Sequence, residues 1–376
     1  MNKKNLAIIC SSAFSLINFR YELICELNKK FYIDTFSEDR SQKVSKKLKK
    51  KKISNETYGV KLKINFLINQ VISLINFVTI FYFKKKKYDY YFVYSIKAIL
   101  FSAFLNFKNS KVIFLVTGLG FLFKNNNKNL LKKCFKFLLM SILRKSLKKN
   151  NLIFFQNKDD KKVFLKRKLI NKNNKIFIMN GSGVNISKFN FQKKFPKQFT
   201  VLMISRIVKD KGIDVFFEAA EKLKEKNENI HFVFCGQTHT GVDSYNFDIF
   251  EKKIKELNIK LIVNSSKIKD IIKNSSVVVL PSPYREGVPR SLLEAISIGR
   301  PVIGTNVPGI KEVIKHSWNG FFMRKKSSSD LVRYILKLKA DKNKFSKLCY
   351  NARKLAVKKF EVKKVNQVFL SKIYKY

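Results

Sequence analysis

The chain has 376 residues, and its 45% hydrophobic and 14% aromatic content, with only 13 Gly and 6 Pro, excludes a disordered protein. Its length favours two domains that can each bury a core. The net charge of +52 would suit binding to a nucleic acid or to an anionic membrane. However, the lysines are spread along the whole chain, and there is no RNP-like motif, zinc finger or repeat. We therefore expect a compositional bias with some attraction to membranes and no nucleic-acid partner.

Short apolar strands alternate with basic helical segments through the first half of the chain. The first apolar run is too short for a signal peptide and is interpreted as a strand. Strands that alternate with helices predict a mostly parallel sheet. The expected strands are residues 5–10, 32–36, 90–94, 111–116, 151–155 and 175–179.

Residues 64–83 are long and apolar enough to be mistaken for a membrane span, and four lysines follow them at 84–87. Polar residues interrupt the stretch at intervals of three to four and give a helix one polar stripe. These residues are Asn65, Asn69, Gln70, Ser73 and Asn76. We favour a buried or interfacial amphipathic helix over a span.

A second helix is expected at residues 132–149, where lysines alternate with Leu, Phe and Ile. One interpretation is a helix that lies on the anionic inner leaflet of a membrane. The other is a core helix with a charged outer face. The basic run 43–52 has the same two interpretations.

A polar segment without periodicity, residues 189–197, separates the two halves, and the alternation of strands and helices restarts at 198. Strands are expected at 199–204, 230–235, 260–263, 277–280 and 301–304, with a helix at 214–226 and a helical segment from 345 to 376. The predicted fold class is α/β, with two Rossmann-like doubly wound domains that face each other across a cleft and share a ligand there. We expect an N-terminal domain at 1–190, a C-terminal domain at 191–360, and a final helix, 361–376, that returns to the first domain.

Two acids flank the start of a helix in the second domain. Glu286 lies on the loop after the strand 277–280, Gly287 permits a tight turn, and Pro289 suits a first helical residue, so Glu294 should lie in the second helical turn. The carboxyl edge of an open α/β sheet is where ligands bind, and the amides of a new helix favour an anion. The alternative for Glu286 is an ion pair with Arg285 or Arg290, and for Glu294 an ion pair on the helix surface.

Two cations follow the first strand of this domain. Arg206 and Lys211, before Gly212, should lie at the same edge as the acids. Arginine offers a planar fork and lysine a point charge, a combination suited to a diphosphate. A solvated basic loop is the alternative. Taken with the acid pair, the cations favour a nucleotide-sugar site in which one acid bridges ribose hydroxyls and the other contacts the sugar.

These motifs resemble glycosyltransferase family 4, retaining nucleotide-sugar transferases of GT-B fold, and in particular the bacterial members that extend polyprenyl-diphosphate-linked saccharides, such as N-acetylgalactosaminyltransferases. The resemblance extends over nearly the whole chain. It is carried by Arg206…Lys211-Gly212, Glu286-Gly-Val-Pro-Arg-Ser-Leu-Leu-Glu294-Ala, Gly299-Arg-Pro-Val-Ile-Gly-Thr-Asn-Val-Pro-Gly309, Asn18-Phe19-Arg20, Thr117-Gly118-Leu119-Gly120, Phe155-Gln156-Asn157 and Asn180-Gly181-Ser182-Gly183-Val184-Asn185. Many relatives have a glycine-rich loop after the first strand, where this chain has Ser11-Ser-Ala-Phe-Ser15.

The resemblance also implies roles for single residues. Arg206 and Lys211 bind the donor diphosphate, Glu286 faces the donor sugar, and Glu294 contacts the ribose. Glu286, Arg206 and Lys211 are then the catalytic residues, and Asn18 and Arg20 lie on the acceptor side. The remaining donor-binding residues are Gly118, Gly120, Gly287, Val288 and Pro289.

The other reactive side chains give little sign of chemistry. The three histidines, His231, His239 and His316, all lie outside the first domain, and we expect none of them to be catalytic. No Asp-x-Asp occurs, so we expect no metal and no cofactor beyond the nucleotide-sugar co-substrate. The five cysteines are widely spaced without a C-x-x-C pair and are interpreted as reduced, cytosolic thiols.

The sequence therefore predicts a cytoplasmic enzyme, peripheral on the inner face of the membrane. It moves a hexose or N-acetylhexosamine from a nucleoside-diphosphate sugar, expected to be a UDP sugar, to a polyprenyl-diphosphate-linked saccharide. The expected partners are the nucleotide sugar, the lipid-linked acceptor and the anionic inner membrane surface. Two alternatives remain: a nucleotide-sugar epimerase of GT-B fold, and a basic protein that binds membrane or nucleic acid without catalysis.

Overall fold

The computed structural model describes residues 3–62, 64–84, 86–120, 123, 130–147, 151–171, 174–194, 196–237 and 244–376. The chain divides into two compact units, Met1–Met179 together with Asn366–Tyr376, and Asn180–Val365. The boundary between the two units, expected at residue 190, lies after Met179. It lies earlier because the turn after Asn180 packs with the second unit. A Cβ on Gly181 would lie 2.7 Å from the Cβ of Val288.

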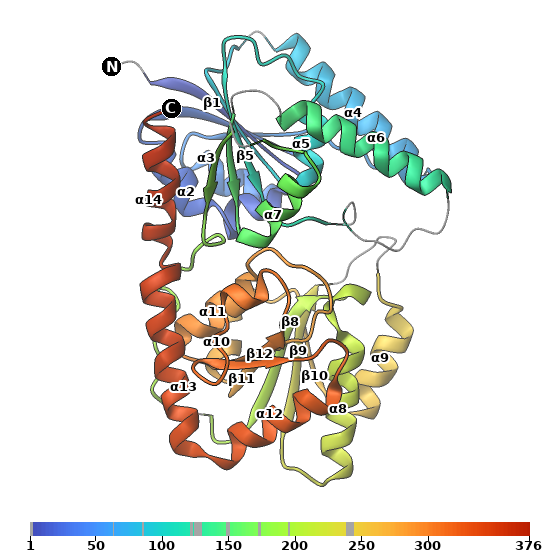
Figure 1. Ribbon diagram of the computed structural model, residues 1–376, viewed down its shortest axis with the longest axis vertical. Coiled ribbons are helices and arrows are strands. Elements are labelled where there is room, and N and C mark those ends of the chain that lie inside the picture. The colour runs from blue at the N-terminus through green and yellow to red at the C-terminus, as the bar shows by residue number, and fades with distance from the viewer. Residues whose placement is uncertain are drawn as a thin grey trace. The chain divides into compact units, whose positions relative to one another are not determined.

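The first unit contains a seven-stranded parallel sheet in the order β3-β2-β1-β4-β5-β6-β7. Its strands are β1 Lys4–Cys10, β2 Phe31–Ser37, β3 Ser54–Thr57, β4 Tyr90–Tyr94, β5 Lys111–Val116, β6 Leu152–Phe155 and β7 Lys175–Ile178. Its helices are α1 Ala13–Asn18, α2 Tyr21–Leu27, α3 Gln42–Lys49, α4 Phe66–Phe83, α5 Ile96–Ser102, α6 Leu130–Leu147 and α7 Lys158–Lys166. Figure 1 shows these helices around the sheet.

The C-terminal residues of the chain complete the core of the first unit. Phe369 is fully buried, and its ring lies 4.7 Å from those of Phe92 on β4 and Phe154 on β6. Phe369 belongs to α14 (Val362–Ile373). Tyr374, directly after this helix, stacks on Phe31 of β2 at 6.4 Å between ring centroids.

The second unit contains a six-stranded parallel sheet in the order β10-β9-β8-β11-β12-β13. Successive residues of one strand enter different cores, since Val277 and Val279 of β11 pack in one cluster and Val278 and Leu280 in another. The strands are β8 Thr200–Arg206, β9 His231–Gln237, β10 Lys260–Val263, β11 Val277–Leu280, β12 Val302–Thr305 and β13 Gly320–Met323. The α-helices are α8 Ile213–Glu225, α9 Phe247–Glu256, α10 Ile268–Lys273, α11 Arg290–Ile298, α12 Ser328–Ala340 and α13 Lys342–Leu355, with 3-10 turns η2 Lys209–Lys211 and η3 Ile310–Glu312 and a π-helical segment η4 Ala356–Phe360.

Two parallel α/β sheets with helices on both faces confirm the expected fold class. Two strands were not expected from the sequence, β3 and β13. The helix after β11 begins at Arg290 rather than at Pro289, which is its N-cap with φ −67° and ψ 122°. The basic run at 43–52 forms α3, whose Val44 and Leu48 are buried while most of its lysines are exposed, so it is a helix with a charged outer face.

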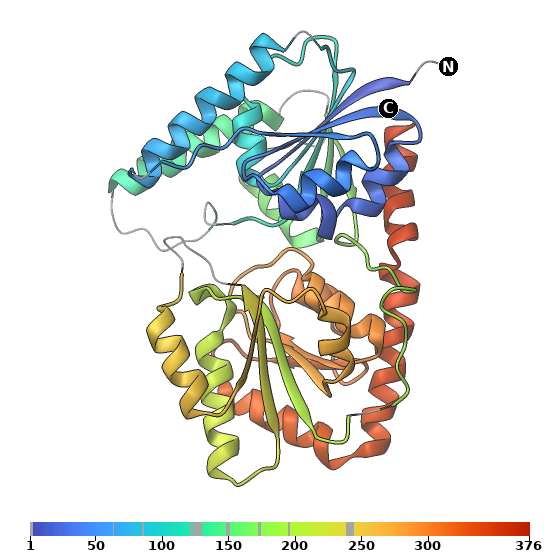
Figure 2. The same ribbon diagram turned by 180° about the vertical axis from the view of Figure 1, so that it is seen from behind.

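The apolar stretch 64–83 forms α4; of the two forms expected for it, the buried one is wrong and the interfacial one stays a prediction. It is long and apolar enough to cross a membrane by length and composition, yet only 11% of it is buried inside the protein. Ser73 and Phe77 are its buried residues. In Figures 1 and 2 it runs side by side with α6.

Candidate functional site

The sheet of the second unit places Lys211 and Glu286 in direct contact. Lys211 follows β8 and Glu286 follows β11, and these strands are neighbours whose carboxyl ends share one edge. The Lys211 ammonium donates to the Glu286 carboxylate at 2.6 Å, and both side chains are less than one-fifth exposed. Two of the three residues expected to be catalytic are thus brought together. The partner of Glu286 is Lys211 and not the adjacent arginines considered from the sequence.

Close backbone packing joins the loops that carry this pair. Gly212, directly after Lys211, has φ +75°, and a Cβ there would lie 2.3 Å from the carbonyl oxygen of Pro281. The Ser282 hydroxyl donates to the Asp210 carbonyl at 2.9 Å. Only glycine allows this approach, so the position of Lys211 depends on Gly212.

A third loop, after β12, supports Glu286 from the other side. The Glu286 amide donates to the Pro308 carbonyl at 3.1 Å. Gly309 has φ +86°, and a Cβ there would lie 1.9 Å from the Gly287 oxygen and 2.4 Å from the Glu286 oxygen. This contact was not predicted from the sequence, in which Pro308-Gly309 directly after a strand was the available signal.

Glu294 is bound within its own helix. Its carboxylate accepts a hydrogen bond from Arg290 Nε at 2.9 Å, an ion pair at i, i+4 with both side chains less than 15% exposed. Arg290 also donates to the Gly183 carbonyl at 2.6 Å, which ties α11 to the turn that starts the unit. The helix ion pair considered as the alternative for Glu294 is therefore present. The expected contact with a ribose stays a prediction.

The other expected donor-binding residues of this unit lie around the pair. Arg206 is the last residue of β8 and is exposed, and within the described part of the chain no ion pair involves its guanidinium. Val288 is buried against Gly181, and Gly287 and Pro289 complete the turn into α11. Arg206 is therefore a cation available to an anion at this edge.

The remaining expected site residues belong to the first unit. Gly118 and Gly120 follow β5 with φ of +140° and +61°. Asn18 is exposed at the end of α1, and its amide donates to the Phe14 carbonyl of the same helix at 3.0 Å. Arg20 is buried, with its guanidinium 5.9 Å from the centre of the Tyr94 ring.

The carboxyl edge of the first sheet contains its own polar cluster. Asp39 accepts hydrogen bonds from the Ala13 amide and the Ser12 hydroxyl at the start of α1. The Ser15 and Tyr94 hydroxyls are 2.8 Å apart. Burial raises the pKa of the Cys10 thiol below them to about 11, which keeps the thiol protonated. Asp39 thus holds the start of α1 against the end of β2.

Two of the three histidines lie among the described residues. The His316 Nδ1 accepts from the Phe322 amide at 3.0 Å, and burial lowers the pKa of His316. His231 begins β9, and His239 lies outside the described residues. Among the described residues, no group of three or more His, Cys, Asp or Glu could hold a metal ion.

The edge at β8 and β11 has the charges that a diphosphate needs. The first intrahelical bond of α11 runs from the Leu293 amide to the Pro289 carbonyl, so the preceding amides of the helix have no partner within it. These amides carry the positive end of the helix dipole. With Lys211 and Arg206 they form a positive region beside one carboxylate, Glu286.

Comparison with known proteins agrees with this arrangement. Residues 185–355 match the family described as "Glycosyl transferases group 1". A Campylobacter jejuni N,N'-diacetylbacillosaminyl-diphospho-undecaprenol alpha-1,3-N-acetylgalactosaminyltransferase is 28% identical over 230 residues, 58% of each protein. An Escherichia coli UDP-Gal:alpha-D-GlcNAc-diphosphoundecaprenol alpha-1,3-galactosyltransferase is 27% identical over 303 residues, 76% of this chain and 75% of the relative.

The fold has a solved counterpart over almost the whole chain. Anabaena HepE in complex with UDP and glucose has a TM-score of 0.77 at 15% identity and covers 99% of this chain and 100% of its own. These matches confirm the GT-B fold and the resemblance to bacterial transferases that act on polyprenyl-diphosphate-linked saccharides.

Proposed function

We propose that this chain, which contains a group 1 glycosyltransferase domain, is a retaining transferase. It moves a hexose or N-acetylhexosamine from a UDP sugar to a saccharide on a polyprenyl diphosphate, in the synthesis of a bacterial surface polysaccharide or glycan. It works without a metal and lies peripherally on the inner face of the membrane. The observation that carries the proposal is the contact of Lys211 with Glu286 at the shared edge of β8 and β11.

The site supports transfer because its cations and its acid have separate tasks. Lys211, Arg206 and the first amides of α11 stabilise the negative charge that grows on the departing diphosphate. The bond between the sugar's anomeric carbon and the β-phosphate oxygen breaks, and the acceptor hydroxyl oxygen forms the new bond. The acceptor's proton passes to the departing phosphate or to solvent. Glu286 faces the donor sugar and holds Lys211 in place.

The relatives support the choice of substrates. The E. coli relative is named for UDP-Gal as donor, and both relatives are named for diphospho-undecaprenol acceptors. HepE was solved with UDP and glucose. A UDP sugar and a polyprenyl diphosphate are therefore the first substrates to test.

The test is to incubate the purified protein with a panel of nucleotide sugars and polyprenyl-diphosphate acceptors and to measure nucleotide release and acceptor mass. Transfer from at least one donor is expected. Glu286→Gln should lower turnover by about 10³-fold yet keep UDP binding, because Lys211 remains, whereas Lys211→Ala should weaken both by about 10²-fold. Glu228→Gln, which breaks the remote Lys339–Glu228 ion pair, is the matched control and should leave both unchanged.

Each rival function predicts a different result. A nucleotide-sugar epimerase would release an epimerised sugar without any acceptor. A non-catalytic basic protein would bind polyanions with strong salt dependence and would be indifferent to Glu286→Gln. Full transfer activity in Glu286→Gln would contradict the role given to Glu286.

A further inference from the structure

Helix α4 has its polar side turned toward the protein. The Asn69 amide group bonds to the backbone of Leu62 at 2.9 Å and 3.0 Å. The Ser73 hydroxyl accepts from the Val60 amide at 2.9 Å, and the Asn76 amide donates to the Tyr58 carbonyl at 2.9 Å. Three residues of the polar stripe recognised in the sequence therefore bond to the backbone of the segment before the helix, and Ser73 among them is buried.

The opposite side of α4 is apolar and exposed. More than half of the surface of each of seven side chains is accessible, namely Phe66, Leu67, Ile68, Val71, Ile75, Tyr82 and Phe83. Ile68, Val71, Ile75 and Tyr82 recur at helical spacing along one stripe. A contiguous apolar surface of this kind marks an interaction site rather than an ordinary water-exposed helix.

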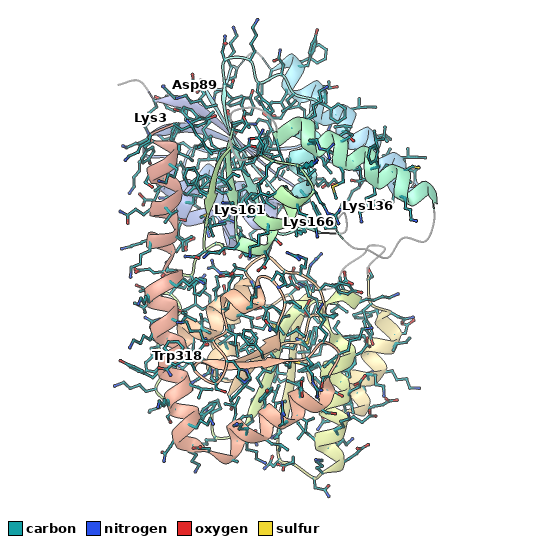
Figure 3. All side chains as sticks on the ribbon, in the orientation of Figure 1. Lys3, Asp89, Lys136, Lys161, Lys166 and Trp318 are labelled. Atoms are coloured by element: carbon teal, nitrogen blue, oxygen red, sulfur yellow. The ribbon has the colours of Figure 1, made fainter. Side chains whose placement is uncertain are left out.

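The neighbouring helix α6 extends the same character. Figures 1 and 2 show α6 beside α4, and its Phe135, Phe137 and Leu138 are exposed. Lys133 and Lys145 of α6 are exposed as well. Lys136, labelled in Figure 3, is only partly exposed, and burial together with Arg167 lowers its pKa.

The charges of the two helices identify the occupant of this surface. Neither α4 nor α6 contains an Asp or Glu in its sequence. A second copy of the chain docked on this face would bring lysines against lysines, whereas anionic lipid headgroups complement them. The bonds from Asn69 and Ser73 to the preceding segment hold α4 on the domain, so the helix lies along a surface and does not cross a membrane.

We propose that the apolar face of α4 inserts into the interfacial zone of an anionic bilayer, with the lysines of α6 on the headgroups. The anchoring helix thus has its polar stripe satisfied by its own protein and only its apolar stripe in the lipid. The inference rests on the proposed function because a lipid-linked acceptor would bring the enzyme to a membrane. Binding of the helix to a membrane can be measured without activity.

The test is sedimentation of the full-length protein with vesicles of phosphatidylcholine alone or with phosphatidylglycerol, without sugar or acceptor. Wild type should bind the anionic vesicles and keep part of its binding at high salt, because apolar insertion is not screened. Replacing Ile68, Val71 and Ile75 together by Ser should weaken partitioning at least tenfold. The control replaces three exposed apolar side chains elsewhere, Ile249, Tyr350 and Val368, by Ser and should bind as wild type does.

A second measurement reports insertion directly. The chain has one tryptophan, Trp318, so Val71→Trp in a Trp318→Phe background gives a single fluorophore on the α4 face. Its emission should shift to the blue on anionic vesicles and be quenched by brominated lipids. Unshifted emission, undiminished vesicle binding of the triple variant, or a wild-type dimer that this variant dissociates would each overturn the inference. Vesicle binding without any sugar transfer would contradict the proposed function alone.

Discussion

Gly309 gives a prediction whose size follows from the structure. In Gly309→Ala the new Cβ would lie 1.9 Å from the Gly287 oxygen, and a real Cβ needs at least about 3.0 Å, so the Glu286-Gly287 segment must move by about 1 Å. A displacement of about 1 Å at a catalytic group can cost about 10²-fold in rate. The strain of φ +86° adds about 1–2 kcal/mol and the overpacking about 1–3 kcal/mol to the loss of stability.

The assay compares kcat/KM and Tm of Gly309→Ala with those of Gly299→Ala. Gly299 has φ +87°, and a Cβ there would lie 2.3 Å from the Phe191 side chain, so its variant has the same backbone strain away from Glu286 without a backbone clash at this distance. Both variants should lose several degrees in Tm. Only Gly309→Ala should lose about 10²-fold in kcat/KM at a temperature where both are folded. A folded Gly309→Ala enzyme within threefold of wild type would refute the link between this loop and Glu286.

Two further changes test stability in the two units. Phe369→Ala removes a fully buried ring between Phe92 and Phe154 and should cost about 3–5 kcal/mol in denaturant unfolding of the first unit; a loss below 1 kcal/mol would contradict its place in that core. Hydrogen bonds from Arg324 lower the pKa of Asp330 to about 2. The ionised Asp330 therefore stabilises the folded protein fully above the ordinary carboxyl pKa of about 3.9, and this contribution is lost as the pH falls through about 2. Because Arg324 is 80% exposed, Asp330→Asn should lower the free energy of unfolding by only about 1 kcal/mol at pH 6. The difference in stability between wild type and variant should shrink toward pH 3, and unfolding curves in which it grows would contradict this pH dependence.

Most strands with apolar runs were predictable, and the polar strand β3 was not. β11 is Val-Val-Val-Leu and was expected at 277–280. β3, Ser-Asn-Glu-Thr, lies at the sheet edge beside β2 and has no hydrophobic pattern to reveal it. β13, Gly-Phe-Phe-Met, has only three apolar residues directly after a turn and was missed.

At the site, the sequence identified the edge but not the pairing. Strand order was enough to place Lys211 and Glu286 in neighbouring loops. Their ion pair depends on the close backbone contacts at Gly212 and Gly309, and no local sequence pattern predicts these contacts. The same limit applies to α4, because periodicity shows that a polar stripe exists but not which side of the helix faces the protein.

The position of Phe369 has a consequence for the order in which the chain folds during synthesis. The second unit is one continuous segment, Asn180–Val365, and its core includes Phe360, which is synthesised only shortly before Phe369. The first unit begins the chain but lacks part of its core until that residue emerges from the ribosome. We therefore expect the first unit to complete its packing no earlier than the second, unlike the usual order in which N-terminal domains fold ahead of those that follow them.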